Sequence, residues 1–345
     1  MIYRRLIRPL LFQMEAEEAH NFVFSRLKRW QHSEAFLEFL KGQLCVTDSK
    51  LEVQTAGLRF PNPVGLAAGF DKNGALIPAL SATGFGFLEI GSVTAEPSAG
   101  NRKPRMFRLP SDRALINRMG LNNDGARAVA QGLPAKAARK VPLGINIAKT
   151  PNLHRSTEGG IYDYVRSYKL LAPHADYTTI NISCPNTGDG KSFESPELFL
   201  RLMQALAEVR LRDVPFFIKF SADTSDSVLR ELLMIAEEAQ ADGYVAVNTS
   251  VSRDGLATPN GELEAIGNGG LSGTPLAKTA ADRIAYIRER TAPGKTLISV
   301  GGIDSPKEAR KRLQAGADLI QIYTGLVYEG PQLPGTICRE LLRSW

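Results

Sequence analysis

Cysteine and histidine are scarce in this sequence. Its 345 residues include three cysteines, Cys45, Cys184 and Cys338, and four histidines. None of them lies in an HxxxH or HExxH pattern or in the paired spacing of a zinc-binding motif, so the sequence predicts no metal site. A small, odd number of cysteines is typical of proteins in a reducing compartment.

A long apolar run is also missing. No run reaches the roughly 18 residues of a membrane-spanning helix, and Arg4, Arg5, Arg8 and Pro9 interrupt the first apolar residues, which is not typical of a secretory signal. The net charge is +6 and the pI is near 9.2. Because the basic residues form no stripe with interleaved aromatics, no nucleic-acid partner is expected. We expect a soluble or peripherally bound protein whose charge suits an acidic ligand or an anionic membrane surface.

The chain does contain a repeating order of short apolar strands and helical stretches. With 43% hydrophobic residues it can bury a large core. Serine followed by proline at 195–196 and at 305–306 predicts two of the helix starts. Eight strands alternating with helices over about 290 residues predict an α/β fold, a (β/α)8 TIM barrel. The strands are expected at Val64–Ala67, Phe87–Ile90, Leu143–Ile147, Tyr177–Ile182, Phe216–Phe220, Gly243–Val247, Leu297–Val300 and Leu319–Ile322.

Residues 1–45 are expected to form an N-terminal helical extension, and residues 46–345 the barrel, which is preceded by a hairpin at Leu51–Phe60. In the extension, Pro9 is suited to open one helix, and apolar residues recur at helical spacing on both sides of Ser33. Two interpretations remain open. The helices are an amphipathic cap packed on the barrel, which the pattern alone favours, or their apolar face contacts a membrane or a lipid-like ligand.

Each expected strand ends in polar residues or glycine. TIM barrels carry their chemistry at the carboxyl ends of the strands, and lysines next to apolar runs are costly unless paired, so we predict a ligand site at this rim. The simpler explanation, that strands end where polarity begins, accounts for Ser92 but not for the lysines. The strand ends are Asp71-Lys72, Ser92, Asn146, Asn181, Lys219, Asn248-Thr249, Gly301-Gly302 and Tyr323-Thr324.

Glycine runs at 269–273 and 301–302 accompany the last strands, where barrels commonly bind a phosphate through backbone N–H groups. They predict a phosphorylated ligand such as FMN. No GxGxxG follows a first strand, so a Rossmann nucleotide site is not expected. Lys72 and Lys219 have two interpretations. One of them forms a Schiff base, as in barrel aldolases, or one of them stabilises an anionic reduced flavin.

The stretch 177–188 contains a thiol between two carboxamides. A β-branched run ends at Asn181 and continues as Ser183-Cys184-Pro185-Asn186. Pro185 disfavours a helical backbone at Cys184, so the thiol is expected on an extended turn just past the strand. This place at the rim predicts a catalytic base, and the alternative is an inert buried thiol.

Motifs along nearly the whole chain resemble dihydroorotate dehydrogenases and occur in the order of that family. The start, LFQMEAEEAHNFVFSRLKR (11–29), resembles the quinone-linked, membrane-associated class 2 branch. The other motifs are AAGFDKNG (67–74), EIGSVT (89–94), GNRKPRMFRLP (100–110), NRMGLNN (117–123), LGINIAK (143–149), NISCPNT (181–187), IKF (218–220), VNTS (247–250), GGLSG (269–273), SVGGIDS (299–305) and GADLIQIYTGLVYEGP (316–331).

This resemblance implies that FMN and dihydroorotate bind together at the barrel rim. The positions that match FMN contacts are Ala68, Gly69, Ser92, Asn146, Asn181, Lys219, Val247, Gly273, Gly302, Tyr323 and Thr324. The positions that match contacts with dihydroorotate are Lys72, Asn117, Arg118, Met119, Gly120, Leu121, Asn181, Asn186, Asn248 and Thr249.

By the same resemblance, Cys184 matches the catalytic base, which removes the C5 proton of dihydroorotate while C6 passes hydride to the flavin N5. Orotate leaves, and in class 2 a quinone reoxidises FMN through a tunnel under the N-terminal helices. The implied protein is an enzyme of de novo pyrimidine synthesis, peripheral on the cytoplasmic side of the cell membrane. The alternatives are an FMN-dependent paralogue with another dihydropyrimidine or a soluble acceptor, a Schiff-base lyase, and a barrel without turnover.

Three features depart from the class 2 pattern. Class 2 members typically have serine where this chain has Cys184, and cysteine is usual in the soluble class 1 enzymes. The loop Gly188–Ser195 lacks the Pro-Gly-Leu-Arg pattern of class 2, and Ala148 and Thr150 replace a glycine and an asparagine. These differences concern the class and the gating of substrate rather than the FMN positions.

Overall fold

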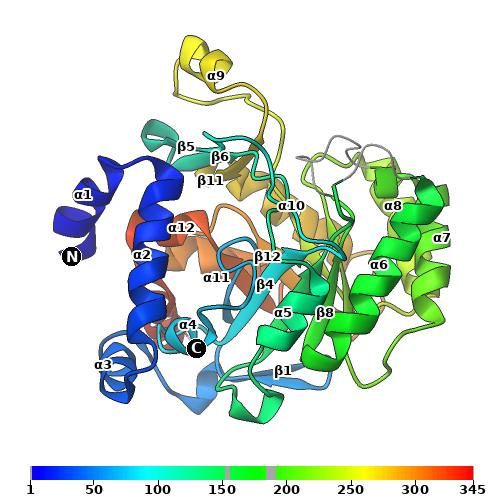
Figure 1. Ribbon diagram of the computed structural model, residues 1–345, viewed down its shortest axis with the longest axis horizontal. Coiled ribbons are helices and arrows are strands. Elements are labelled where there is room, and N and C mark those ends of the chain that lie inside the picture. Colours follow the sequence, from blue (N-terminus) through cyan, green and yellow to red (C-terminus); the bar gives the residue numbers. More distant parts are fainter. Residues whose placement is uncertain (1, 152–155, 184–191, 345) are drawn as a thin grey trace.

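Eight parallel strands close into a barrel in the computed structural model, which describes residues 2–151, 156–183 and 192–344 (Figure 1). In the order of their pairing, the strands are β10 (Gly243–Ala246), β12 (Thr296–Val300), β13 (Leu319–Ile322), β3 (Val64–Leu66), β4 (Phe87–Val93), β7 (Leu143–Ile147), β8 (Tyr177–Asn181) and β9 (Phe216–Phe220). Each is one of the predicted strands, so the predicted TIM barrel is confirmed. β7, β8 and β9 are buried along their whole length, which accounts for their continuous apolar runs.

Helices follow the strands and cover the outside of the barrel. They are α4 (Ile77–Ser81), α5 (Ala126–Gly132), α6 (Thr157–Leu171), α7 (Pro196–Ala207), α8 (Asp226–Glu238), α10 (Ala277–Arg288), α11 (Pro306–Gln314) and α13 (Leu333–Ser344). As predicted, α7 and α11 begin at the prolines of the two serine–proline pairs. Ser305 caps α11 by accepting a hydrogen bond of 3.4 Å from the backbone N–H of Glu308.

A hairpin covers the end of the barrel at which the strands begin. β1 (Val53–Thr55) and β2 (Leu58–Phe60) pair antiparallel across a tight turn, which confirms the predicted hairpin. Phe60 packs edge-on against Phe87, the first residue of β4, with the ring centroids 5.3 Å apart. Both rings belong to a buried apolar cluster inside the barrel, so side chains fill the end of the barrel at which the strands begin.

A second sheet, which the sequence did not predict, stands beside the opposite end of the barrel. It is antiparallel and pairs β5 (Met106–Leu109) with β6 (Ala114–Asn117) and β6 with β11 (Gly270–Gly273). The glycine-rich run 269–273 is therefore largely a strand and not a turn. Figure 1 shows α9 (Asn260–Ile266) projecting from the molecule on this side, and its Leu263 and Ile266 pack on the sheet in a small separate core.

The N-terminal residues form helices, as predicted. They are the π-helical turn η1 (Tyr3–Ile7), α1 (Arg8–Phe12), α2 (Ala16–Trp30) and α3 (Glu34–Leu44). The carboxylate of Glu15 accepts hydrogen bonds from two backbone N–H groups and caps α2. Tyr3 OH donates to the carbonyl of Val327 at 2.7 Å, in the short helix α12 (Thr324–Glu329). Within the residues described, no helix is both long enough and apolar enough to cross a membrane.

Candidate active site

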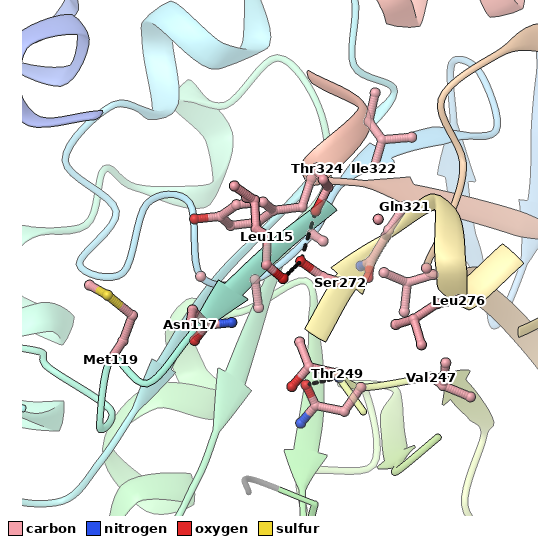
Figure 2. A pocket seen from close by; sticks show the side chains of 18 of the residues that line it. Leu115, Asn117, Met119, Val247, Thr249, Ser272, Leu276, Gln321, Ile322 and Thr324 are labelled. Carbon is pink, nitrogen blue, oxygen red and sulfur yellow. Dashed lines mark hydrogen bonds between the residues drawn. The ribbon is translucent and has the colours of Figure 1, made fainter. Parts of the chain in front are cut away.

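A pocket opens at the carboxyl ends of the barrel strands, between the barrel and the second sheet (Figure 2). It contains about 1140 Å³ of empty space, a figure that includes its open mouth. The predicted site residues that line it are Ala68, Gly69, Lys72, Ser92, Asn117, Met119, Gly120, Leu121, Asn181, Lys219, Val247, Asn248, Thr249, Gly273, Gly302, Tyr323 and Thr324.

Two predicted residues are described by the structure but do not line the pocket. Asn146 is fully buried one step behind it, where its Oδ1 accepts a hydrogen bond from Ser92 Oγ. Arg118 turns away, lies over the ring of Phe107 and donates to the carbonyls of Ile266 and Asn268. Its guanidinium therefore holds the second sheet to the segment after α9.

Cys184 and Asn186 lie outside the described residues. The last described residue before them is Ser183, whose backbone N–H and hydroxyl donate to Asn181 Oδ1 at 3.2 and 3.1 Å. Asn248 Nδ2 in turn donates to the Ser183 carbonyl at 2.9 Å. The rim at the end of β8 is thus tied to the segment that follows β10.

One wall of the pocket comes from neighbouring barrel strands. Lys219 in β9 lies directly opposite Asn181 in β8, and both side chains are buried. Asn181 Nδ2 donates to Ser92 Oγ on β4 at 3.0 Å. Because the neighbouring strands β8 and β9, together with β4, hold these groups and their rotamers are enclosed, this wall is rigid and polar.

Beneath this wall, one layer of the barrel interior is polar. Glu89 is 1% exposed, and its Oε1 accepts a hydrogen bond from Asn146 Nδ2 at 2.8 Å. Its Oε2 accepts from Tyr177 OH at 3.1 Å, Thr179 Oγ1 at 3.2 Å and Gln321 Nε2 at 2.8 Å. Burial, together with the charge of Glu89, raises the pKa of Tyr177 well above its ordinary value. Four donors offset the cost of burying the carboxylate.

Gln321 is a pocket residue that the sequence did not single out. It lies in β13, and its Nε2 donates to Glu89, so its Oε1 is the atom left for other partners. Within the described part of the chain this buried oxygen has no hydrogen-bond partner. A glutamate and a glutamine inside two predicted apolar strands were the available signal for this polar layer.

The facing wall comes from the second sheet and the loops beside it. Figure 2 shows Leu115 and Asn117 of β6 opposite Thr249 and Val247, which follow β10. Asn117 Nδ2 donates to the carbonyl of Gly270 at 3.4 Å. A side chain at Gly270 would meet Thr249 Oγ1 at 2.1 Å, so glycine is required there because β11 passes close to Thr249.

The glycine-rich end of the pocket combines backbone and hydroxyl groups. Gly301, Gly302 and Gly273 line it together with Thr324, and Ser272 Oγ lies 2.9 Å from Thr324 Oγ1. The first backbone bond of α12 is made by the N–H of Leu326. The N–H groups of Thr324 and the next residue precede that bond, as the first donors of any helix do, and both residues line the pocket.

Aromatic rings connect the pocket to the N-terminal extension. Tyr323 lines the pocket and packs edge-on against Phe70 with centroids 5.9 Å apart, and His20 of α2 packs on Phe70 at 4.9 Å. Burial, together with the charge of Lys72, lowers the pKa of His20 to about 4. Burial raises the pKa of Tyr323 to about 12. Both side chains are therefore uncharged near neutral pH.

A buried ion pair fastens the extension beside these rings. Glu17 of α2 accepts two hydrogen bonds from Arg105, at 3.0 and 2.8 Å, and both side chains are buried. Although burial raises the pKa of Glu17, the hydrogen bonds and charge of Arg105 outweigh it and lower the pKa. No local sequence pattern marks this pair, since its two residues lie 88 positions apart.

Comparisons with known proteins agree on one family. Residues 50–344 match the family model described as "Dihydroorotate dehydrogenase". The chain is 40% identical to the dihydroorotate dehydrogenase (quinone) of Christiangramia forsetii, over 99% of both chains. It is 41% identical to the protein of the same name from Thermobifida fusca, over 98% of this chain and 91% of that protein.

The fold comparison points the same way. The crystal structure of DHODH from Eimeria tenella in complex with ferulenol superposes with a TM-score of 0.79 at 30% sequence identity, over 95% of this chain and 91% of that chain. The predicted family resemblance is therefore confirmed, and with it the expectation that the chain is an enzyme of the oxidoreductase class.

Proposed function

Because the chain belongs to the dihydroorotate dehydrogenase family, we propose that it oxidises dihydroorotate to orotate in pyrimidine synthesis, with FMN in the barrel-end pocket and a membrane quinone as the electron acceptor. One observation carries the proposal. The described residues that match the family's FMN and dihydroorotate positions come from distant parts of the sequence, and all except Asn146 and Arg118 line a single pocket.

The donor set of the pocket fits FMN. The glycine-rich end offers N–H groups and the hydroxyl of Thr324 to a phosphate. The polar wall offers Lys219 to the ring, where a cation stabilises an anionic reduced flavin. The buried Oε1 of Gln321, which has no partner within the described residues, would accept a hydrogen bond from a ligand N–H or O–H. When bound, FMN supplies the two-electron acceptor for the substrate's hydride.

The residues of the chain would then bind the substrate and move its proton. Asn117, Asn181 and Asn248 line the pocket with carboxamides, which can supply hydrogen-bonding groups to the amide edges of a cyclic ureide. Lys72, whose Nζ donates to Asn122 Oδ1, adds a cation for the substrate carboxylate. Cys184 would take the C5 proton on its sulfur, since a positioned base is needed for a carbon acid next to a carbonyl.

The N-terminal extension is the proposed route to quinone and membrane. Seven of the eleven large hydrophobic side chains that are exposed in the described chain lie between Ile2 and Phe39, and arginines at 4, 5, 8, 26 and 29 accompany them. Such a surface suits the interface of an anionic bilayer. The aromatic contacts from His20 through Phe70 to Tyr323 lead from this extension to the pocket, as a route for electrons to quinone would need. The proposed location is peripheral, on the cytoplasmic face of the membrane.

Anaerobic titration with dihydroorotate tests the proposal. The purified protein should carry a flavin absorption spectrum that dihydroorotate bleaches and a long-chain quinone restores. A colourless protein that does not bind added FMN would contradict the flavin site and revive the Schiff-base alternative at Lys72 or Lys219. Bleaching that only a soluble acceptor reverses would contradict the quinone assignment.

A further inference from the structure

Glu89 occupies a place that the reaction as proposed above does not use. It contacts neither the open pocket nor solvent, since it does not line the pocket and is 1% exposed. Yet its two oxygens accept four hydrogen bonds, which is the full capacity of an ionised carboxylate. An ionised carboxylate accepts and never donates, so each neighbour must turn a donor toward it.

The first consequence concerns a series of hydrogen bonds from Glu89 through Asn146 and Ser92 to Asn181, which we call the relay. Because Asn146 must turn its Nδ2 to Glu89, its Oδ1 faces Ser92 and accepts the hydroxyl proton of Ser92 at 2.5 Å. The Ser92 oxygen is then left to accept from Asn181 Nδ2 at 3.0 Å. Asn181 Oδ1 consequently points to Ser183, which donates to it twice. Every step of this relay has one possible direction once Glu89 is the acceptor at its end.

The second consequence concerns Gln321. Its Nε2 is committed to Glu89, which leaves Oε1 as its only remaining acceptor. Of the groups that line the pocket, Gln321 therefore presents an oxygen, Asn181 keeps its second amide proton, and Ser92 keeps a lone pair. Amide orientation is otherwise free to reverse at little cost, because the oxygen and nitrogen ends of a carboxamide have nearly the same shape.

We propose that Glu89 is a positioning residue that fixes which pocket atoms are donors and which are acceptors, through Gln321 directly and through the relay Asn146–Ser92–Asn181. This inference rests on the proposed function, since the ligand whose binding it sets is FMN. It assigns a role in recognition to a side chain that touches no ligand.

Exchanging the carboxylate and the carboxamide of Glu89 and Asn146 separates the effect of hydrogen-bond direction from the effect of packing. Oε1 of Glu89 serves only Asn146, whereas Oε2 serves Tyr177, Thr179 and Gln321. In Glu89→Gln the new amide nitrogen cannot accept a hydrogen bond. If it faces Asn146 Nδ2, the hydrogen bonds of the relay must reverse, and if it faces Tyr177, Thr179 and Gln321, their hydrogen bonds must reverse instead. In Glu89→Gln combined with Asn146→Asp, the nitrogen of Gln donates to the new carboxylate, and every other bond keeps its direction.

The experiment measures FMN binding and the absorption spectrum of bound FMN in the full-length protein. Glu89→Gln should weaken FMN binding about 10- to 100-fold, the scale of leaving one or two buried polar groups unsatisfied, and should shift the flavin absorption bands. The double variant should recover most of the affinity and the original bands. Asn146→Asp alone, which sets two carboxylates against each other, should bind FMN more weakly than the double variant.

Thr179→Val is the matched control. It removes the hydroxyl that donates to Glu89 at 3.2 Å in the same layer, and it leaves Asn146 and Gln321 in place. It should change FMN affinity by less than about threefold, because no amide that lines the pocket changes direction when this donor is lost. Equal FMN affinity and equal spectra in Glu89→Gln and Thr179→Val would overturn the proposal.

If either single variant fails to fold, the double variant still decides the matter. Recovery of folding and of FMN binding in the double variant supports the relay, and a double variant no better than the single variants contradicts it. Wild-type protein that binds no FMN would contradict the proposed function itself, and this is measured first, so the two failures are distinguishable.

Discussion

The floor of the pocket and the N-terminal extension depart in opposite directions from the usual distribution of polar and apolar groups. In the floor, a carboxylate, two carboxamides and two hydroxyls are enclosed in the barrel around Glu89. In the extension, Leu6 and Leu10 are 63% and 64% exposed and Phe39 is 63% exposed. Each arrangement is unfavourable for a protein that only has to fold.

The difference shows how each region is specialised. Apart from Oε1 of Gln321, the buried polar groups are hydrogen-bonded to one another, so the ligand finds fixed donors and acceptors. The exposed apolar groups have no such partners within the fold, and only an apolar surface outside the chain can cover them. The floor is thus built for recognition of a small molecule, and the extension for contact with a large surface.

The largest effect is expected from removing the extension. A protein that lacks residues 1–43 should lose quinone reduction, whereas dihydroorotate should still bleach its flavin, because the pocket-lining residues lie between Ala67 and Gly325. Stopped-flow reduction and reoxidation, on a sample shown by circular dichroism to be folded, measure the two steps separately. If the protein without residues 1–43 reduced a long-chain quinone at the full rate, the extension would not be the region specialised for quinone.

The second prediction concerns the base at the rim. Cys184→Ala should bind FMN and orotate but reduce flavin at least about 100-fold more slowly, the usual scale of a lost general base. Cys184→Ser is the control, since a serine is a far weaker acid than a thiol of pKa near about 8.5. Its reduction rate should reach a plateau at higher pH than that of the parent. An alanine variant as fast as the parent would make Cys184 a structural thiol.

A smaller effect is expected at the cation of the pocket wall. Lys219→Met keeps the length of the side chain but removes its charge, and it should weaken FMN binding about 10- to 100-fold, as expected for loss of a charged hydrogen-bonding group. Fluorescence titration of the apoprotein with FMN measures the change. Lys278, which is exposed on α10 and paired with Asp282 in the same helix, supplies the control Lys278→Met, which should bind FMN normally. Equal affinities would contradict the role of Lys219.

The smallest effect is expected from single residues of the extension. Leu10→Ser should weaken binding to anionic phospholipid vesicles about tenfold, since burying one leucine side chain contributes about 1.5–3 kcal/mol. Met234→Ser on α8 removes a side chain of similar exposure, 59% against 64%, and should leave vesicle binding unchanged. Vesicle sedimentation measures both. Equal losses would mean that the extension is not the membrane-contacting region.

The sequence predicts the features that depend on residues close together in the chain, and it misses those that depend on residues far apart. The eight barrel strands were found because each is a continuous apolar run, and the extension because its apolar residues recur at helical spacing. The sheet of β5, β6 and β11 was missed, since its pairing joins residues 114–117 to 270–273 and leaves no local pattern. The glycines of that sheet were interpreted as a phosphate loop, although Gly270 is required by its approach to Thr249.

The candidate site shows the same division. Positions carried over from the family motifs lie in the pocket at the carboxyl ends of barrel strands, as Asn181 and Lys219 do. Arg118 follows β6 and does not line the pocket, because its side chain turns to Ile266. Glu89 and Gln321 were hidden inside apolar runs, where only their partners from other strands explain them. Cys184 and Asn186 stay predictions.

The pairing of β6 with β11 also determines when the pocket can form during synthesis of the chain. The strand β6 of the pocket wall is synthesised when about one third of the chain has been made, and its partner follows more than 150 residues later, with Gly270 opposite Asn117. Contacts so distant in sequence form late in folding because a long loop has to close first. A ribosome-bound chain that ends before Gly270 has several barrel strands but lacks this wall, so a cofactor can be enclosed only once the last quarter of the chain is being made.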